Sequence, residues 1–254
     1  MKNLTLSALA VACAFSTQAF AVDGTSLINQ ATVLSAGGFP YHITQSGSYR
    51  LSGNLLVTYT SGIPQAVIIS ADNVTLDLSG FSISCSGCAG ANSSYGVSTG
   101  SLNTTILNGT ISGFSGTVAG SAINFGSGVT TYSSGRVDHV TVSGNSWGVQ
   151  VNTKGTVTVT NGTITDNVSN GIVDTVGPLM ISNCAITNNP VGINAQGISA
   201  SILNNLVVGS TNYGIILGLA GAPGAYGLNN FQGNGVNASG GVSMGNNVCG
   251  SGTC

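Results

Sequence analysis

The segment GRVDHV, residues 135–140, comes closest to a catalytic set in this sequence. Arg136 and Asp138 are two residues apart, and in a strand this spacing places both side chains on the same side. His139 follows directly, and Lys154 lies in the segment that leads to the next predicted strand. A lyase needs a base to abstract a proton, so Arg136 or Lys154 is the candidate base. A surface ion pair beside a corner histidine is the alternative interpretation.

A glycoside hydrolase would instead need two carboxylic acids on one outer face, about 6.5–9.5 Å apart in an inverting enzyme. The chain has no Glu, and its six acidic residues are Asp23, Asp72, Asp77, Asp138, Asp166 and Asp174. We expect them to lie on different faces and at different levels of the fold. A calcium ion would need several carboxylates together, and the spacing does not supply them. No metal and no cofactor are therefore predicted.

Three aromatic residues form a second candidate site. Tyr95, Trp147 and Tyr213 each precede the glycine of a Gly–aliphatic pair, so a repeating fold would place them in one column. A column of aromatic rings is a plausible platform for sugar rings. The alternative is that the rings pack at a corner, because Asn170 and Val191 interrupt the column.

Composition limits the classes of function. The chain has 39 Gly but only 4 Lys plus Arg, and its net charge is −2. A nucleic acid or an anionic membrane surface requires a basic patch, which is missing here. The abundance of Val, Ile, Leu and Thr is typical of strands. Long stretches of strong helix formers are absent.

The cysteines are arranged in two local pairs and one single residue. Cys85 and Cys88 lie in a Gly-Ser segment, and Cys249 and Cys254 bound the last six residues. Two local disulfides are the simplest pairing in an oxidising compartment, although the sequence leaves other pairings open. A redox or metal-binding CxxC is the alternative, but no second CxxC or His pair accompanies it. Cys184 is predicted to be a small buried apolar residue.

A repeat of about 22 residues dominates the second half of the chain. Its Gly–aliphatic pairs are 21 to 23 residues apart and begin at Gly148, Gly171, Gly192 and Gly214. A fixed period built of short strand-like runs is typical of a parallel β-helix, in which each coil buries its apolar face only by stacking on the next. The period predicts two interior columns, with Ile164 on Ile186 and Ile172 on Ile193.

Asparagines follow the same period in two columns. Asn145, Asn167 and Asn189 form the first column, and Asn161, Asn183 and Asn204 form the second. A side-chain amide carries donors and an acceptor, so stacked asparagines can bond from coil to coil. Asparagine also tolerates the left-handed backbone of a tight corner.

Four segments carry a resemblance to a known family: GSYRLSGNL, ADNVTLDLSGFSI, LNGTISGF and the ending NNVCGSGTC. They resemble secreted bacterial proteins of the right-handed parallel β-helix repeat group, within the pectate-lyase-like fold class. The resemblance implies an all-β, right-handed parallel β-helix. It does not fix a function, because this architecture hosts lyases, hydrolases and adhesins. We expect seven to eight coils between Tyr41 and Leu217, with caps at residues 22–40 and 220–254.

The N-terminus has the features of a secretory signal peptide over residues 1–21. Lys2 precedes an apolar run, and Ala19-Phe20-Ala21 is typical of a cleavage site. The run is too short to span a membrane. The domain predicted to remain is residues 22–254, exported to the periplasm or beyond the cell. Lipid attachment at Cys13 is the alternative.

The sequence therefore predicts an exported β-helix protein with a binding or structural role toward a polysaccharide or cell-surface glycan. A carbohydrate-active enzyme, either a polysaccharide lyase or a glycoside hydrolase, is the alternative. The oligomeric state is left open.

Overall fold

The structure is a computed structural model that describes residues 24–126, 132–218, 224–250 and 254. The predicted signal peptide, including Cys13, lies outside the described residues. Within them, no helix is both long and apolar enough to cross a bilayer.

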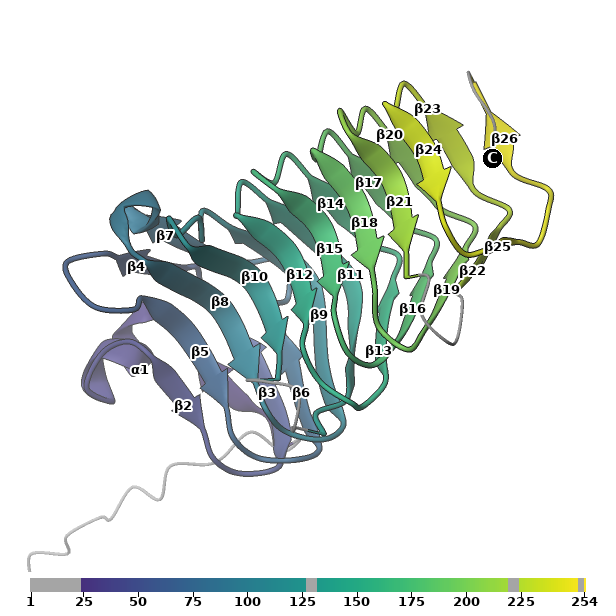
Figure 1. Cartoon of the computed structure of the whole chain (residues 1–254). Helices are drawn as coiled ribbons and strands as arrows, with labels where there is room; N and C mark the ends of the chain where they lie inside the picture. The colour runs from purple at the N-terminus through teal and green to yellow at the C-terminus, as the bar shows by residue number, and fades with distance from the viewer. Residues whose placement is uncertain (1–23, 127–131, 219–223, 251–253) are drawn as a thin grey trace, which may run out of the picture.

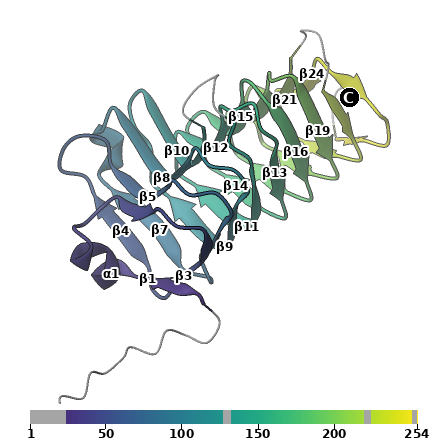
Figure 2. The same ribbon diagram turned by 90° about the horizontal axis from the view of Figure 1, so that it is seen from below.

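The chain folds into an all-β, right-handed parallel β-helix of about 8 turns, as predicted (Figure 1). Two sheets run the length of the stack, and every strand pairs in parallel with the equivalent strand of the next coil. We call the 9-stranded sheet B and the 17-stranded sheet A. Because sheet A bends at a corner within each coil, it presents two faces, A1 and A2. Seen from below, after a turn of 90°, the molecule shows the same succession of coils (Figure 2).

Sheet B contributes one strand to each coil, in the order β2 (Tyr41–Ile43), β5 (Gln65–Ile69), β8 (Ser93–Thr99), β10 (Ala119–Phe125), β12 (Trp147–Val151), β15 (Asn170–Asp174), β18 (Val191–Ala195), β21 (Tyr213–Leu217) and β24 (Val236–Ser239). Eight of these strands lie between Tyr41 and Leu217, which confirms the predicted number of coils.

Face A1 consists of β1 (Ser26–Ile28), β3 (Gly47–Leu51), β6 (Val74–Asp77), β13 (Val157–Thr160), β16 (Pro178–Ser182), β19 (Ser199–Leu203), β22 (Ala225–Gly227) and β25 (Val242–Ser243). Face A2 consists of β4 (Leu55–Thr58), β7 (Ser82–Ser86), β14 (Thr163–Thr165), β17 (Ala185–Thr187), β20 (Leu206–Val208), β23 (Asn230–Gln232) and β26 (Val248–Cys249). Two longer strands, β9 (Thr104–Ser112) and β11 (Gly135–Ser143), pass through both faces.

The interior is built of the predicted aliphatic columns. Ile164 pairs in register with Ile186, and Ile172 pairs with Ile193. All four side chains are at most 1% exposed. Because each side chain packs on its equivalent one coil away, the 21–23-residue period is a direct consequence of core packing.

Glycine recurs at the entry to sheet B for a steric reason. A Cβ atom added to Gly171 would lie 2.6 Å from the carbonyl oxygen of Gly192 in the next coil. Any side chain at this position would therefore collide with backbone. Gly148, Gly192 and Gly214 meet the same obstacle. Close approach of neighbouring coils, rather than a left-handed backbone, explains the Gly–aliphatic pairs.

The first asparagine column forms a buried hydrogen-bonded ladder, as predicted. The side-chain amide of Asn145 donates to Oδ1 of Asn167 over 3.1 Å, and that of Asn167 donates to Oδ1 of Asn189 over 3.0 Å. The backbone N–H groups of Asn145 and Asn167 donate to the same two oxygens. Each amide therefore closes its own corner and joins it to the next coil.

The second asparagine column lies at the corner between faces A1 and A2. Asn161, Asn183 and Asn204 all have φ between 54° and 58°, which is the left-handed region that was predicted. A third column, which the sequence did not predict, is formed by the residues that directly follow those of the second column. In it, the amide of Asn205 donates to Oδ1 of Asn229 over 3.0 Å, and Asn229 bonds to Asn247.

The two ends of the stack are built differently. At the N-terminal end, β1 pairs with β3, and the short helix α1 (Gln30–Ser35) lies beside the first coils (Figure 1). Within the described residues, the segment predicted as the C-terminal cap contains the short strands β22 to β26, which continue the strand pairing of both sheets. Cys249 and Cys254 form a disulfide in this segment. Cys85 and Cys88 form the other predicted disulfide, and the 3₁₀ turn η1 (Cys88–Gly90) begins at its second cysteine.

Candidate functional site

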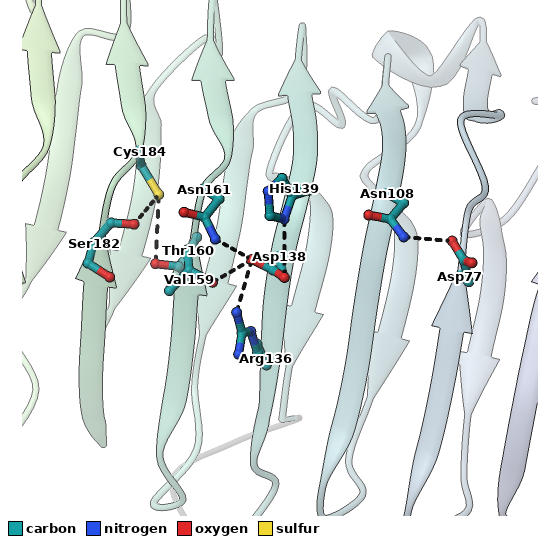
Figure 3. A network of polar contacts seen from close by, with 10 residues as sticks. All are labelled: Asp77, Asn108, Arg136, Asp138, His139, Val159, Thr160, Asn161, Ser182 and Cys184. Atoms are coloured by element: carbon teal, nitrogen blue, oxygen red, sulfur yellow. Dashed lines mark hydrogen bonds and ion pairs between the residues drawn. The ribbon is translucent and has the colours of Figure 1, made fainter.

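The charged cluster predicted from GRVDHV exists on face A1 (Figure 3). Arg136 and Asp138 both point outward from β11, and the guanidinium lies 3.1 Å from Oδ1 of the carboxylate. On the other side, Nδ1 of His139 lies 3.2 Å from Oδ2. The next coil contributes Thr160 and Asn161, which donate to Oδ1 over 2.7 and 2.8 Å. Asp138 is therefore the centre of the cluster.

These contacts fix the protonation state of Asp138. Burial alone would raise its pKa, but hydrogen bonds from Thr160, Asn161, Arg136 and His139 outweigh burial and hold the pKa well below its usual range. The carboxylate is ionised at any physiological pH. It cannot donate a proton to a leaving group, and its oxygens are already occupied by protein donors.

The other members of the cluster are explained by the fold. His139 has a φ of 53° and occupies the left-handed corner that Asn108 and Asn161 fill in the neighbouring coils. The ammonium of Lys154 lies 5.5 Å from the centre of the Tyr132 ring. Among the described residues, the ion pairs join Asp138 to Arg136 and to His139 only. The sequence thus grouped three residues correctly, but Lys154 has a different partner.

A second carboxylate shares the outer row of Asp138. The register aligns Asp77 with Leu107 and Leu107 with Asp138, so the two acids stand two coils apart on one face. The expectation that all the acids lie on different faces does not hold for this pair. Strand spacing separates them by about 9–10 Å, but the Leu107 side chain stands between them. Asp77 itself accepts hydrogen bonds from the backbone N–H of Ser79 and from Asn108, which makes it a corner-forming residue (Figure 3).

The aromatic column lies on the outer face of sheet B. Tyr95 aligns with Ser121, which aligns with Trp147, so these two rings are two coils apart. Asn170 and Val191 follow in the same column before Tyr213. The register therefore places the three predicted aromatics in one row, with Tyr213 separated from the other two.

A hollow of about 300 Å³ opens on the same face. Its lining is formed by Gln65, Tyr95, Ser98, Asn124, Gly126, Gln150 and Asn152. No charged side chain is among these described lining residues. Tyr95 is predictable from its place before a Gly–aliphatic pair, but the amides are not, because single Asn and Gln residues are frequent in this chain. The signal that could have found them is their spacing, since Ser98, Asn124 and Gln150 are separated by 26 residues each.

Two buried side chains that could in principle react, Cys184 and Asp174, are held by hydrogen bonds within the coils. Cys184 lies in the third column, where its backbone N–H donates to Asn205, and burial raises the pKa of its thiol to about 11. The prediction of a buried, unreactive cysteine is confirmed in its burial. Asp174 points into the interior at the end of β15, where its Oδ1 accepts from the backbone N–H groups of Val176 and Gly177.

Within the described residues, no group of three or more His, Cys, Asp or Glu side chains could hold a metal ion. Comparison of the chain with models of protein families, with curated proteins and with solved structures finds no match.

Proposed function

We propose that this protein is an exported, non-catalytic binding protein for a polysaccharide or cell-surface glycan, and that it binds its ligand on the outer face of sheet B. One observation carries the proposal: Tyr95 borders a hollow lined by side-chain amides, and Trp147 stands two coils from Tyr95 in the same column of sheet B. Aromatic rings stack on the apolar faces of sugars, while amides exchange hydrogen bonds with sugar hydroxyls. The linear repeat of the stack suits an extended polymer.

Export is part of the proposal. It is supported by the signal-peptide features of residues 1–21 and by the two disulfides, which fit an oxidising compartment. The sequence resemblance to secreted β-helix proteins of the pectate-lyase-like class points the same way. Right-handed parallel β-helix geometry is compatible with that class but does not define a function.

Catalysis is the alternative, and the charged cluster argues against it. A polysaccharide lyase or a glycoside hydrolase needs a proton donor or a base with free access to substrate. Asp138 is ionised and engaged in four interactions, one of them with Arg136. Lys154, the other candidate base, lies against Tyr132 rather than in the cluster.

The test is a glycan array with the purified protein, combined with a product assay on polyuronides and neutral polysaccharides. We expect glycan binding without turnover. Tyr95→Ala and Trp147→Ala should each weaken binding about tenfold, whereas Met180→Ala, an exposed change on face A1, should have no effect. Steady release of products, abolished by Arg136→Ala or Lys154→Ala in a folded protein, would establish the enzyme instead.

A further inference from the structure

We propose that the hollow on sheet B is a subsite for a neutral sugar unit, and that it selects neutral glycans over uronic-acid polymers. The inference rests on the proposed glycan-binding function and names the class of ligand. It follows from the arrangement of amides in the hollow, from one buried polar atom without a partner, and from the charges of the lining residues.

The hollow contains a column of polar side chains with regular spacing. Ser98 aligns with Asn124, and Asn124 aligns with Gln150, in three successive coils. Adjacent strands are about 4.7–4.9 Å apart, so one hydroxyl placed between two of these side chains can reach both. Oε1 of Gln150 accepts a hydrogen bond from Ser121 over 2.8 Å. This bond orients the amide and leaves its NH₂ group as a donor for a ligand.

Asn124 shows that the described residues do not satisfy all the hydrogen-bonding groups of this column. The residue is 9% exposed, and its Oδ1 is a buried atom to which none of the described residues donates a hydrogen bond. A buried acceptor without a donor is unfavourable. The torsion that turns an asparagine amide is soft, so the oxygen can rotate toward the hollow when a donor arrives there. A sugar hydroxyl is such a donor, and the same hydroxyl can accept from Gln150.

Charge decides between neutral and acidic sugars. A uronate carboxylate that leaves water needs a cationic partner, and arginine is the usual one. The described lining residues are uncharged. Arg136, by contrast, lies on face A1 and is paired with Asp138. A neutral sugar loses no ionic solvation on entry, and Tyr95 at the edge of the hollow offers a ring for stacking.

Calorimetry on the full purified protein tests this inference, with cellohexaose, xylohexaose and chitohexaose as neutral probes and hexagalacturonate as the acidic probe. We expect at least one neutral probe to bind, and hexagalacturonate to bind at least tenfold more weakly. Asn124→Ala and Gln150→Ala should each weaken the neutral probe at least tenfold. Asn194→Ala is the matched control, because Asn194 stands in the same column two coils beyond Gln150, and it should bind like the unmodified protein.

Each outcome has a definite meaning. Neutral binding that survives both Asn124→Ala and Gln150→Ala would overturn the hollow as the subsite while leaving glycan binding in place. Tighter binding of hexagalacturonate would overturn the assignment to neutral sugars. If none of the four probes binds and the glycan array is also blank, the proposed function itself fails. Circular dichroism of each variant shows whether it is folded, and two independent variants in the hollow keep the test valid if one of them is not.

Discussion

The side chain of Asn145 donates to Oδ1 of Asn167, 22 residues later in the sequence and one coil further in space. The same oxygen accepts the backbone N–H of Asn145. One amide thus satisfies two buried donors of the preceding coil, while its own NH₂ group reaches Asn189. The ladder replaces regular strand pairing at the corner, where the chain turns from face A2 into sheet B.

Replacement of Asn167 by alanine should destabilise the protein by about 2–3 kcal/mol. The change removes an acceptor for two buried N–H groups of Asn145, and each buried unpaired donor costs about 1–3 kcal/mol. Urea unfolding followed by circular dichroism measures the difference. Asn194→Ala, a half-buried amide on sheet B, is the control and should cost much less. Equal midpoints for both variants would show that the ladder contributes little.

The interior column allows a graded test. Ile186→Val removes one buried methyl group and should cost about 0.5–1.5 kcal/mol. Ile186→Asp introduces a charge that would lie between Ile164 and Val207, and the protein should not fold, because an isolated charge in an apolar interior is very unfavourable. Expression yield and thermal melts compare the two variants. A folded Ile186→Asp protein would contradict the register.

The fold was predictable because each coil repeats the same physical problem. An inward aliphatic residue must pack on its equivalent, and a corner must turn with left-handed residues, so Ile164 and Ile186, or Asn161 and Asn183, recur at one spacing. The third column was harder to recognise, because Cys184 replaces asparagine in it and the step from Asn229 to Asn247 is only 18 residues. A coil of 24 residues from Asn205 to Asn229, followed by one of 18, breaks the period on which the prediction depends.

The candidate site was less predictable than the fold. Alternation within one strand was enough to pair Arg136 with Asp138. The position of Lys154, by contrast, depends on a loop path that the period does not describe, so its contact with Tyr132 could not be predicted from the spacing. The hollow depends on side chains from four coils, and single polar residues such as Asn124 carry no local pattern that marks them.

The structure also changes what we expect of the charged cluster. A surface ion pair, which is the alternative interpretation of GRVDHV, would contribute little to stability. Asp138, however, accepts hydrogen bonds from the next coil, so Asp138→Ala should cost about 1–3 kcal/mol at pH 7. Lys154→Ala should change stability by less than about 0.5 kcal/mol. Equal effects of the two changes in urea melts would mean that the contacts of Asp138 are not stabilising.

Cys184 should be unreactive while the protein is folded. Burial raises the pKa of its thiol to about 11, and the thiolate is the reactive form. A thiol reagent at pH 8 should label the folded protein at least a hundredfold more slowly than the protein in 6 M guanidinium. Because the other four cysteines of residues 22–254 are in disulfides, labelling of that predicted mature chain, which lacks Cys13, reports on Cys184 when no reductant is present. Fast labelling of the folded state would place the thiol at the surface.

Asp174 gives the stability of the protein a pH dependence of its own. Burial raises the pKa of this carboxyl from 3.8 to about 6, although hydrogen bonds from the backbone N–H groups of Val176 and Gly177 oppose the shift. The folded state therefore binds the proton more tightly than the unfolded state. The stability that the protonated Asp174 gives to the fold is fully present below about pH 4. It is lost as the pH rises through 6, because the buried carboxyl then ionises. A shift of this size corresponds to about 3 kcal/mol.

Asp174→Asn isolates this effect, since the amide oxygen can still accept from Val176 and Gly177 but the side chain no longer titrates. In urea unfolding at pH 4.5 and pH 7.5, the unmodified protein should lose stability at the higher pH, and the variant should lose about 2 kcal/mol less, because the unfolded carboxyl is already mostly ionised at pH 4.5. Asp138 does not obscure the comparison, because its depressed pKa makes it act mainly below pH 4. Identical pH profiles for the two proteins would mean that Asp174 titrates in the folded state as it does in the unfolded chain.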